Sequence, residues 1–178
     1  MKLILIGTDH RLQQTVIRDT NTKAWLPRKD GHRYHTLIAY CIDKLGAKAI
    51  VEEAHADQEK TAPTICSKIA KERGLPWQSI GLSEPSHHDA LCDPPFMDAV
   101  RARVKPDMLA GVYDLQRQGV REEFMHTNIA KFIRVHDSVL AVVGLVHLGV
   151  LARRFAAEGI NVEAFVFTYP LVVDETLS

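Results

Sequence analysis

The chain has 178 residues, no formal net charge, 46% hydrophobic residues and 25% charged residues. This size favours one packed domain over residues 1–178, and the composition is that of a globular protein. No apolar stretch approaches the roughly 20 residues of a membrane span. The balanced charge gives no general attraction to nucleic acid or to an anionic membrane, so we expect neither as a partner.

Strand and helix patterns alternate through the first half of the sequence. Apolar runs predict strands, and apolar residues at three- and four-residue spacing predict helices. Glycines at 46 and 74 are expected to end the two helices. The expected elements are a strand at 2–7, a helix at about 34–45, a strand at 47–52, a helix at about 62–73 and a weaker strand at 77–82.

The second half continues the alternation after a stretch rich in turn-forming residues. That stretch, residues 83–95, predicts a loop. It is followed by a helical region near 96–136, a strand at 139–143, a helix that ends at Gly159 and a last strand at 161–167. Strands that alternate with helices predict an α/β fold, with a mainly parallel sheet flanked by helices in a single domain.

Two Gly-x-x-His segments follow the strands at the two ends of this pattern. They are Gly7-Thr8-Asp9-His10 and Gly144-Leu145-Val146-His147, and the apolar runs before them are continuous, as in strands buried on both faces. Each glycine is expected to allow a tight strand-to-loop turn or a close approach. Because open α/β sheets bind ligands at the carboxyl ends of their strands, we predict that His10 and His147 belong to a site there.

A pair of glutamates, Glu52 and Glu53, closes the second predicted strand. Neighbouring residues of an extended chain point to opposite faces, so at least one of the two is expected in the site. Two histidines with one or two carboxylates suit Zn²⁺, Mn²⁺, Co²⁺ or Fe²⁺ and leave room for an activated water. We predict His10, His147 and Glu52 as ligands of a divalent metal, with a glutamate as general base; direct acid–base catalysis is the alternative.

These features together resemble the TraB/Tiki-type superfamily, which includes ChaN-like and erythromycin-esterase-like proteins. Its members carry two Gly-x-x-His motifs and a glutamate pair, and the segment Arg121-Glu122-Glu123-Phe124-Met125 is similar to the helix that precedes their second motif. The resemblance implies a metal-dependent hydrolase or protease-like site, with Glu52, Glu53 and Arg121 as catalytic residues. Some relatives bind haem or open a macrolide lactone without an evident metal.

Three functions follow from these patterns. The first is a metal-dependent hydrolase that acts on a small-molecule or peptide substrate through an activated water. The second is a non-enzymatic module that binds a small ligand, haem or a peptide in the same pocket. The third is a protein with a vestigial pocket that works through its surfaces as a homo-oligomer.

The remaining histidines and Asp9 are assigned weaker roles. Asp9 either binds a metal, orients His10, or hydrogen-bonds the turn backbone. His55 follows the glutamate pair after Ala54, and His32 and His35 either face a substrate anion or border solvent. The segment His87-His88-Asp89 is more typical of a surface loop. The basic and aromatic segment Lys23–Lys29 predicts a solvated loop.

Three cysteines, Cys41, Cys66 and Cys92, show no paired spacing. Cys41 and Cys66 fall within helical apolar patterns, so they are expected to be buried free thiols. Free thiols favour a reducing compartment, and we expect the protein in the cytoplasm.

Overall fold

The computed structural model describes the chain except for residues 14–15, 19–24, 28–30, 55–62, 82–105 and 169–178. Side chains are described for most, but not all, of the remaining residues; that of His10 is not among them. Several predictions lie outside the described residues: the loop at 83–95 with His87, His88 and Asp89, the start of the helical region at 96–105, His55, Cys92, and the two ends of the Lys23–Lys29 segment.

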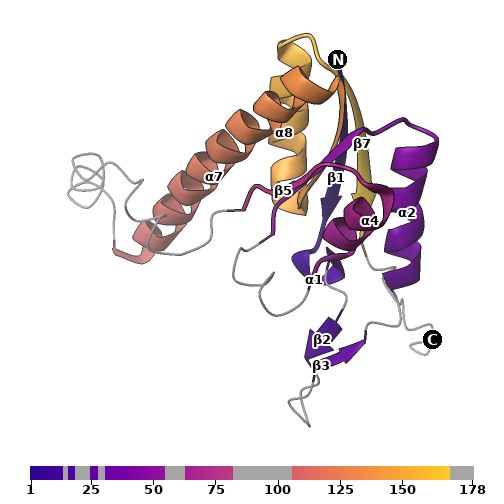
Figure 1. The fold of residues 1–178 in the computed structure, drawn as a ribbon. Helices are drawn as coiled ribbons and strands as arrows, with labels where there is room; N and C mark the ends of the chain where they lie inside the picture. Colours follow the sequence, from indigo (N-terminus) through magenta and orange to yellow (C-terminus); the bar gives the residue numbers. More distant parts are fainter. Residues whose placement is uncertain (14–15, 19–24, 28–30, 55–62, 82–105, 169–178) are drawn as a thin grey trace, which may run out of the picture.

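Five parallel strands form the main sheet, in the order β5-β4-β6-β1-β7. The strands are β1 (Lys2–Thr8), β4 (Ala49–Glu52), β5 (Trp77–Ser79), β6 (Ser138–Gly144) and β7 (Asn161–Phe167). All five were expected from the sequence, and β7 has the predicted bounds. The α/β fold class with a parallel sheet flanked by helices is confirmed (Figure 1).

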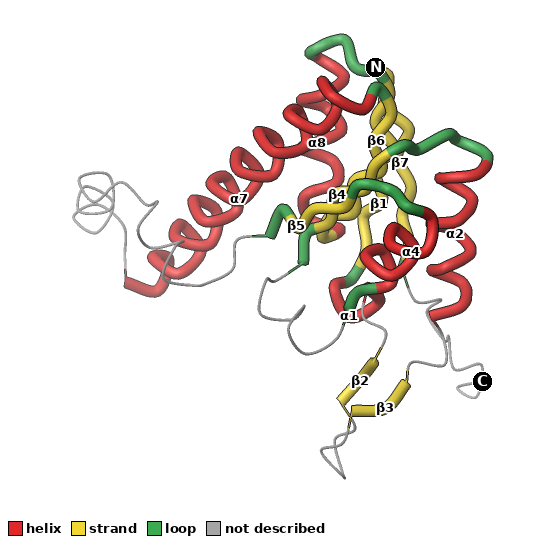
Figure 2. The backbone as a smooth tube through the Cα atoms, viewed as in Figure 1, coloured by secondary structure: helices red, strands yellow, loops and turns green. Residues whose placement is uncertain are grey.

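Helices cover both faces of this sheet (Figure 2). One face packs against α2 (Gly31–Asp43) and α4 (Ile65–Arg73), and the other packs against α7 (Pro106–His136) and α8 (Leu145–Ala157). A short helix, α1 (His10–Gln13), follows β1. The predicted apolar faces are the buried ones, with Met125, Ile129, Ile133, Leu148, Leu151 and Phe155 in the core on the α7/α8 side.

The sequence accounts for the burial of the strands and for the two ends of helix α4. β1 and β6, which have continuous apolar runs, lie in the middle of the sheet, whereas the edge strand β7 alternates between exposed and partly buried residues. Helix α4 begins after Thr64, whose hydroxyl accepts from the Ser67 N–H. It ends at Gly74, which has a φ of 63°, as predicted for a left-handed helix cap.

One short sheet was not predicted. β2 (Val16–Arg18) and β3 (Trp25–Pro27) pair antiparallel, so the expectation of a solvated loop was wrong for Trp25–Pro27. Three-residue strands are too short to show alternation, and a proline favours a loop in a sequence pattern. A two-stranded ribbon nevertheless accepts Pro27, because a strand with an open edge does not need every N–H.

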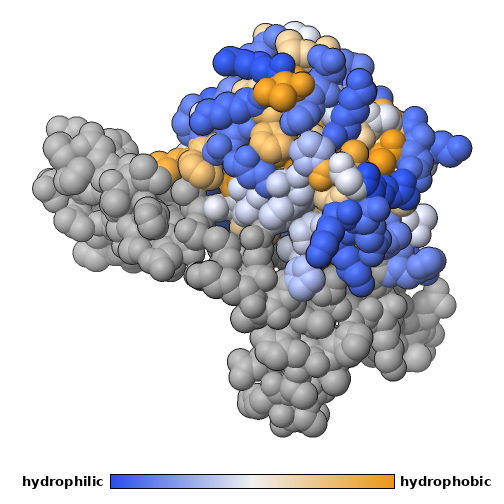
Figure 3. Space-filling view, viewed as in Figure 1, coloured by the Kyte–Doolittle hydropathy of each residue, from blue (hydrophilic) through white to orange (hydrophobic). Residues whose placement is uncertain are grey.

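The chain leaves the two central strands toward opposite faces. After β1 it passes to α2 on one face, and after β6 it enters α8 on the other. Such a divergence between neighbouring strands is the topological switch point of the sheet, and in open α/β sheets ligands usually bind at the carboxyl ends of the strands there. The described residues on the face in Figure 3 are mainly hydrophilic, with small apolar groups among them. No helix in the described part of the chain is long and apolar enough to cross a membrane.

Candidate functional site

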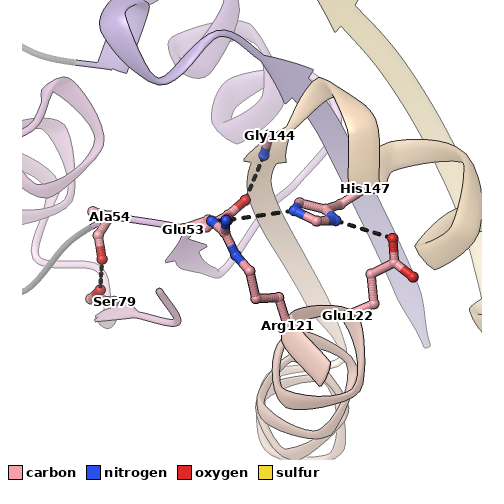
Figure 4. A network of polar contacts seen from close by, with 7 residues as sticks. All are labelled: Glu53, Ala54, Ser79, Arg121, Glu122, Gly144 and His147. Carbon is pink, nitrogen blue, oxygen red and sulfur yellow. Dashed lines mark hydrogen bonds and ion pairs between the residues drawn. The ribbon is translucent and has the colours of Figure 1, made fainter. Parts of the chain in front are cut away.

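Glu53 directly follows β4 and places its carboxylate at the carboxyl edge of the sheet (Figure 4). The side chain is 3% exposed. Oε2 accepts from the backbone N–H of Gly144 at 2.7 Å, and Oε1 pairs with the Arg121 guanidinium. Gly144 is the last residue of β6, and α8 begins at the next residue. A negative charge at this position is favoured by the dipole of α8.

Arg121 reaches Glu53 from α7, one turn before the buried Met125. The family resemblance implied a catalytic role for Arg121, and the structure brings this residue to the predicted edge of the sheet. Its side chain is 27% exposed, which makes it the most exposed member of the group around Glu53. It therefore offers the remaining guanidinium N–H groups to a molecule that arrives from solvent.

His147 lies in the first turn of α8 between two carboxylates and is 2% exposed. Nδ1 is 3.1 Å from Glu122 Oε1, and Nε2 is 3.8 Å from Glu53 Oε1. His147 and Glu122 therefore form a hydrogen bond, whereas the contact between His147 and Glu53 is an ion pair that is too long for a hydrogen bond. Glu122 thus fixes the ring through one nitrogen, and the other nitrogen faces Glu53 across a short gap.

Glu52 points to the opposite face of the sheet, as the alternation of an extended chain requires. Its side chain is fully buried, and Oε2 accepts from the Thr64 hydroxyl at 2.5 Å and from Trp77 Nε1 at 3.2 Å. On the same side, the Tyr34 hydroxyl lies 3.5 Å from Cys66 Sγ. Burial, with the Glu52 charge as a further cause, raises the pKa of the Cys66 thiol well above its ordinary value.

The first Gly-x-x-His segment ends in α1, which His10 begins. The backbone carbonyl of Asp9 accepts from the Leu12 N–H at 2.8 Å and so closes the first turn of this helix. The expectation of a strand-to-loop turn at Gly7 was wrong, because Gly7 remains inside β1 and pairs with Val143. The close approach expected there does occur: a Cβ at Gly7 would lie 2.8 Å from Leu148 Cδ2 of α8.

The other described candidates are either exposed on the surface or buried in the core. His32 and His35 are exposed on α2. Cys41 and Cys66 are buried free thiols, as predicted. Burial raises the pKa of Cys41 to about 11, which makes its thiol a poor nucleophile at neutral pH.

The predicted metal needs several His, Cys, Asp or Glu side chains close together. No three such side chains in the described part of the chain lie close enough together to hold an ion. Among the described residues, Gly144 contacts one oxygen of Glu53, and the Arg121 guanidinium pairs with the other. The described donors alone do not form a metal site, and a site that includes His10 stays a prediction.

No family model matches this chain, and no curated protein or solved structure is significantly similar to it. The resemblance to the TraB/Tiki-type superfamily therefore stays a prediction that depends on the quoted motifs.

Two parts of the site were missed by the sequence analysis. Glu122 was quoted in the helix segment but received no role, although it lies three residues before the buried Met125 and so shares a helix face with it. That spacing was an available signal. The Gly144 N–H gave no signal, because a backbone donor looks the same at every position.

Proposed function

We propose that the carboxyl edge of the sheet is the active site of a hydrolase in which His147 transfers the proton and Arg121 binds an anionic atom of the substrate. The observation that carries the proposal is the line of contacts from Glu122 through His147 to Glu53 and Arg121. A buried imidazole oriented by a carboxylate is a common arrangement for general acid–base catalysis.

The steps follow from the two ring nitrogens of His147. With Nδ1–H donated to Glu122, the lone pair of Nε2 accepts a proton from water. The resulting hydroxide forms a bond to the electrophilic centre of the substrate, and the bond to the leaving group breaks. The leaving group takes the proton from Nε2, which restores the neutral ring. General acid–base catalysis of this kind contributes about 10²–10⁴-fold to a rate.

Charge balance supports the protonated intermediate. Glu53 and Glu122 contribute two negative charges, and Arg121 contributes one positive charge. A second positive charge on the imidazolium ring neutralises the group, and the ring then faces a carboxylate from both nitrogens. Arg121 stabilises the negative charge that develops on the substrate, as guanidinium groups do in hydrolytic sites.

The divalent metal, a Mn, Co, Zn or Fe ion in the sequence analysis, has no step in this mechanism. Glu52, one of its predicted ligands, binds Thr64 and Trp77 on the other face. Elemental analysis of protein purified without nickel or chelator, compared with the His10→Ala/His147→Ala double variant, tests the metal separately. Stoichiometric metal in the parent protein alone would add a cofactor to this site.

A binding module is the second candidate, and the exposure of Arg121 favours it. A partly exposed guanidinium held by a buried carboxylate suits recognition of an anionic group without any reaction. For either function we expect a small-molecule or peptide ligand in a reducing compartment such as the cytoplasm, where Cys41 and Cys66 stay free.

The test uses chromogenic esters of three classes: p-nitrophenyl acetate, p-nitrophenyl phosphate and bis(p-nitrophenyl) phosphate. We expect turnover of at least one, with a fall of about 10²-fold or more in His147→Ala and a smaller fall in Glu122→Gln. The matched control is Glu123→Gln, because Glu123 is exposed beside Glu122 and pairs with Arg154. Equal turnover by the parent and His147→Ala would refute the proposal. Saturable binding of the two anionic phosphate esters without turnover would favour the binding module.

A further inference from the structure

A buried carboxylate outside the proposed mechanism, that of Glu52, lies beside the residue that holds Arg121. Its Oε2 accepts two hydrogen bonds from two different elements: Thr64, which caps α4, and Trp77, the first residue of β5. The Thr64 hydroxyl also accepts from the Ser67 N–H at 3.0 Å. One hydroxyl therefore joins the start of α4 to the end of β4.

The main chain of β4 is fixed at the same point. The carbonyl of Glu52 accepts from the N–H of Ile80 at 2.8 Å, and the N–H of Glu53 donates to the carbonyl of Val142 at 2.8 Å. One residue later, the Ser79 hydroxyl donates to the carbonyl of Ala54 at 2.6 Å (Figure 4). The end of β4 is thus held by β5, β6 and α4 together.

This arrangement determines the direction of Glu53. Adjacent side chains of an extended chain point to opposite faces, so a rotation of the backbone at Glu52 would turn the Glu53 carboxylate away from Gly144 and Arg121. The side chain of Glu52 opposes such a rotation because both of its donors belong to packed elements. A charge-assisted hydrogen bond is stronger than a neutral one, which explains a carboxylate at this buried position.

We propose that Glu52 is a positioning residue, which aims Glu53 at Arg121 and Gly144 through its bonds to Thr64 and Trp77, and that it is not a metal ligand. The effect of Glu52 on catalysis rests on the proposed function, whereas its effect on the position of the Glu53 carboxylate does not. Of the two glutamates, Glu52 positions the site and Glu53 is part of it.

The amide proton of Gly144 reports that position directly, because Gly144 N–H donates to Glu53 Oε2. The Gly144 resonance is recorded in ¹H–¹⁵N correlation spectra of the full chain. Its position in Glu53→Gln serves as the reference for a weakened Gly144–Glu53 hydrogen bond. We expect Thr64→Val and Trp77→Phe to move the resonance toward the Glu53→Gln position, although both keep the charge of Glu52. Thr64→Ser keeps the hydroxyl and is expected to restore the parent position.

A purely structural role predicts a different result. Thr64→Val and Trp77→Phe would then lower the free energy of unfolding while the Gly144 resonance stays at the parent position, and this result would overturn the proposal. A direct role is tested with Glu52→Gln, which keeps an acceptor oxygen for both donors. Loss of bound metal or of turnover in Glu52→Gln with an unmoved Gly144 resonance would also overturn it. Equal turnover in His147→Ala refutes the hydrolase but leaves the Gly144 result in force, so the two failures are distinguishable.

Discussion

Glu53 and Gly144, which are 91 positions apart in the sequence, are joined by a 2.7 Å hydrogen bond from the Gly144 N–H to Glu53 Oε2. The bond links the end of β4 to the start of α8, and Arg121 adds a link from the same carboxylate to α7. Three elements that are distant in the sequence therefore meet at one carboxylate. The site and the packing of this end of the sheet depend on the same charge.

Replacement of Glu53 by glutamine is expected to lower the free energy of unfolding by about 2 kcal/mol. Removal of one partner from a fully buried ion pair costs roughly 3–5 kcal/mol. The cost here is smaller because Arg121 is 27% exposed and keeps part of its hydration. Urea unfolding at neutral pH measures the change.

The control for this prediction is Glu123→Gln, one position after Glu122 on the same helix. Glu123 pairs with Arg154 at 2.6 Å, but its side chain is 63% exposed. An exposed pair contributes at most about 1 kcal/mol. Equal losses in the two variants would show that the Glu53–Arg121 pair is no stronger than a surface contact.

Substitution by alanine is expected to change the stability in opposite directions at Gly7, which packs against α8, and at Gly149, which lies within α8. In Gly7→Ala the new Cβ would lie 2.8 Å from Leu148 Cδ2 and 2.9 Å from Leu148 Cβ. Since a Cβ moves only with its backbone, α8 must shift, at a cost of about 1–3 kcal/mol. Gly149 lies within α8 with open space around it, so Gly149→Ala is expected to stabilise by about 0.5–1 kcal/mol.

Thermal unfolding of the two variants distinguishes these effects by sign. Because Leu148 follows His147, the shift of α8 in Gly7→Ala should also reduce any turnover, whereas Gly149→Ala should leave it unchanged. A Gly7→Ala protein as stable as its parent would mean that α8 does not pack on β1 as closely as the structure shows.

The strands of the main sheet were predictable because they coincide with local apolar runs. The continuous runs at Leu3–Ile6 and Val139–Val143 indicated central strands, and the helical spacing of Met125, Ile129 and Ile133 indicated a buried face. The β2/β3 ribbon was not predictable in this way. Strands of three residues are stabilised by pairing with each other, which leaves no periodic pattern in either segment alone.

Part of the candidate site was predictable, but the contacts among its residues were not. Glu53, Arg121 and His147 were all expected near the strand ends, and the structure brings them together. The face that each glutamate would take depends on the register of β4, which is set by pairing with β5 and β6. Since Glu52 and Glu53 are adjacent and identical, the sequence alone does not show which of them faces the site.

Gly81→Ala is expected to disturb the site from outside it. A Cβ at Gly81 would overlap the carbonyl oxygen of Ala54, which already accepts from the Ser79 hydroxyl at 2.6 Å. Because the overlapping atom belongs to the backbone, the end of β4 must move, and we expect a loss of about 1–3 kcal/mol in stability. The Gly144 amide resonance should move as well, since Glu53 precedes Ala54.

The matched control for Gly81 is Gly119, which lies within α7 and has open space around it. Gly119→Ala is expected to stabilise the protein by about 0.5–1 kcal/mol and to leave the Gly144 resonance in place. If Gly81→Ala also leaves that resonance unmoved, the end of β4 does not transmit the displacement to Glu53.

The stability of the fold is expected to fall at alkaline pH because of Cys41. Burial raises the pKa of this thiol from an ordinary value of 9.0 to about 11, with the negative charge of Glu163 as a further cause. The folded state therefore keeps a proton that the unfolded state releases above pH 9, so the unfolded state gains relative stability as the pH rises. The contribution is fully present below pH 9 and is lost as the pH approaches 11. Tyr34 and Cys66, whose pKa values are also raised by burial, act in the same direction.

Cys41→Ala isolates the contribution of one thiol. Between pH 8 and pH 10 the parent is expected to lose about 1 kcal/mol more than the variant, since one pKa unit corresponds to about 1.4 kcal/mol. The small cavity left by alanine lowers the stability of the variant equally at every pH and so does not affect the slope. Urea unfolding at a series of pH values gives both profiles. Parallel profiles would show that Cys41 ionises as readily in the folded protein as in the unfolded chain, which would contradict its burial between α2 and the sheet.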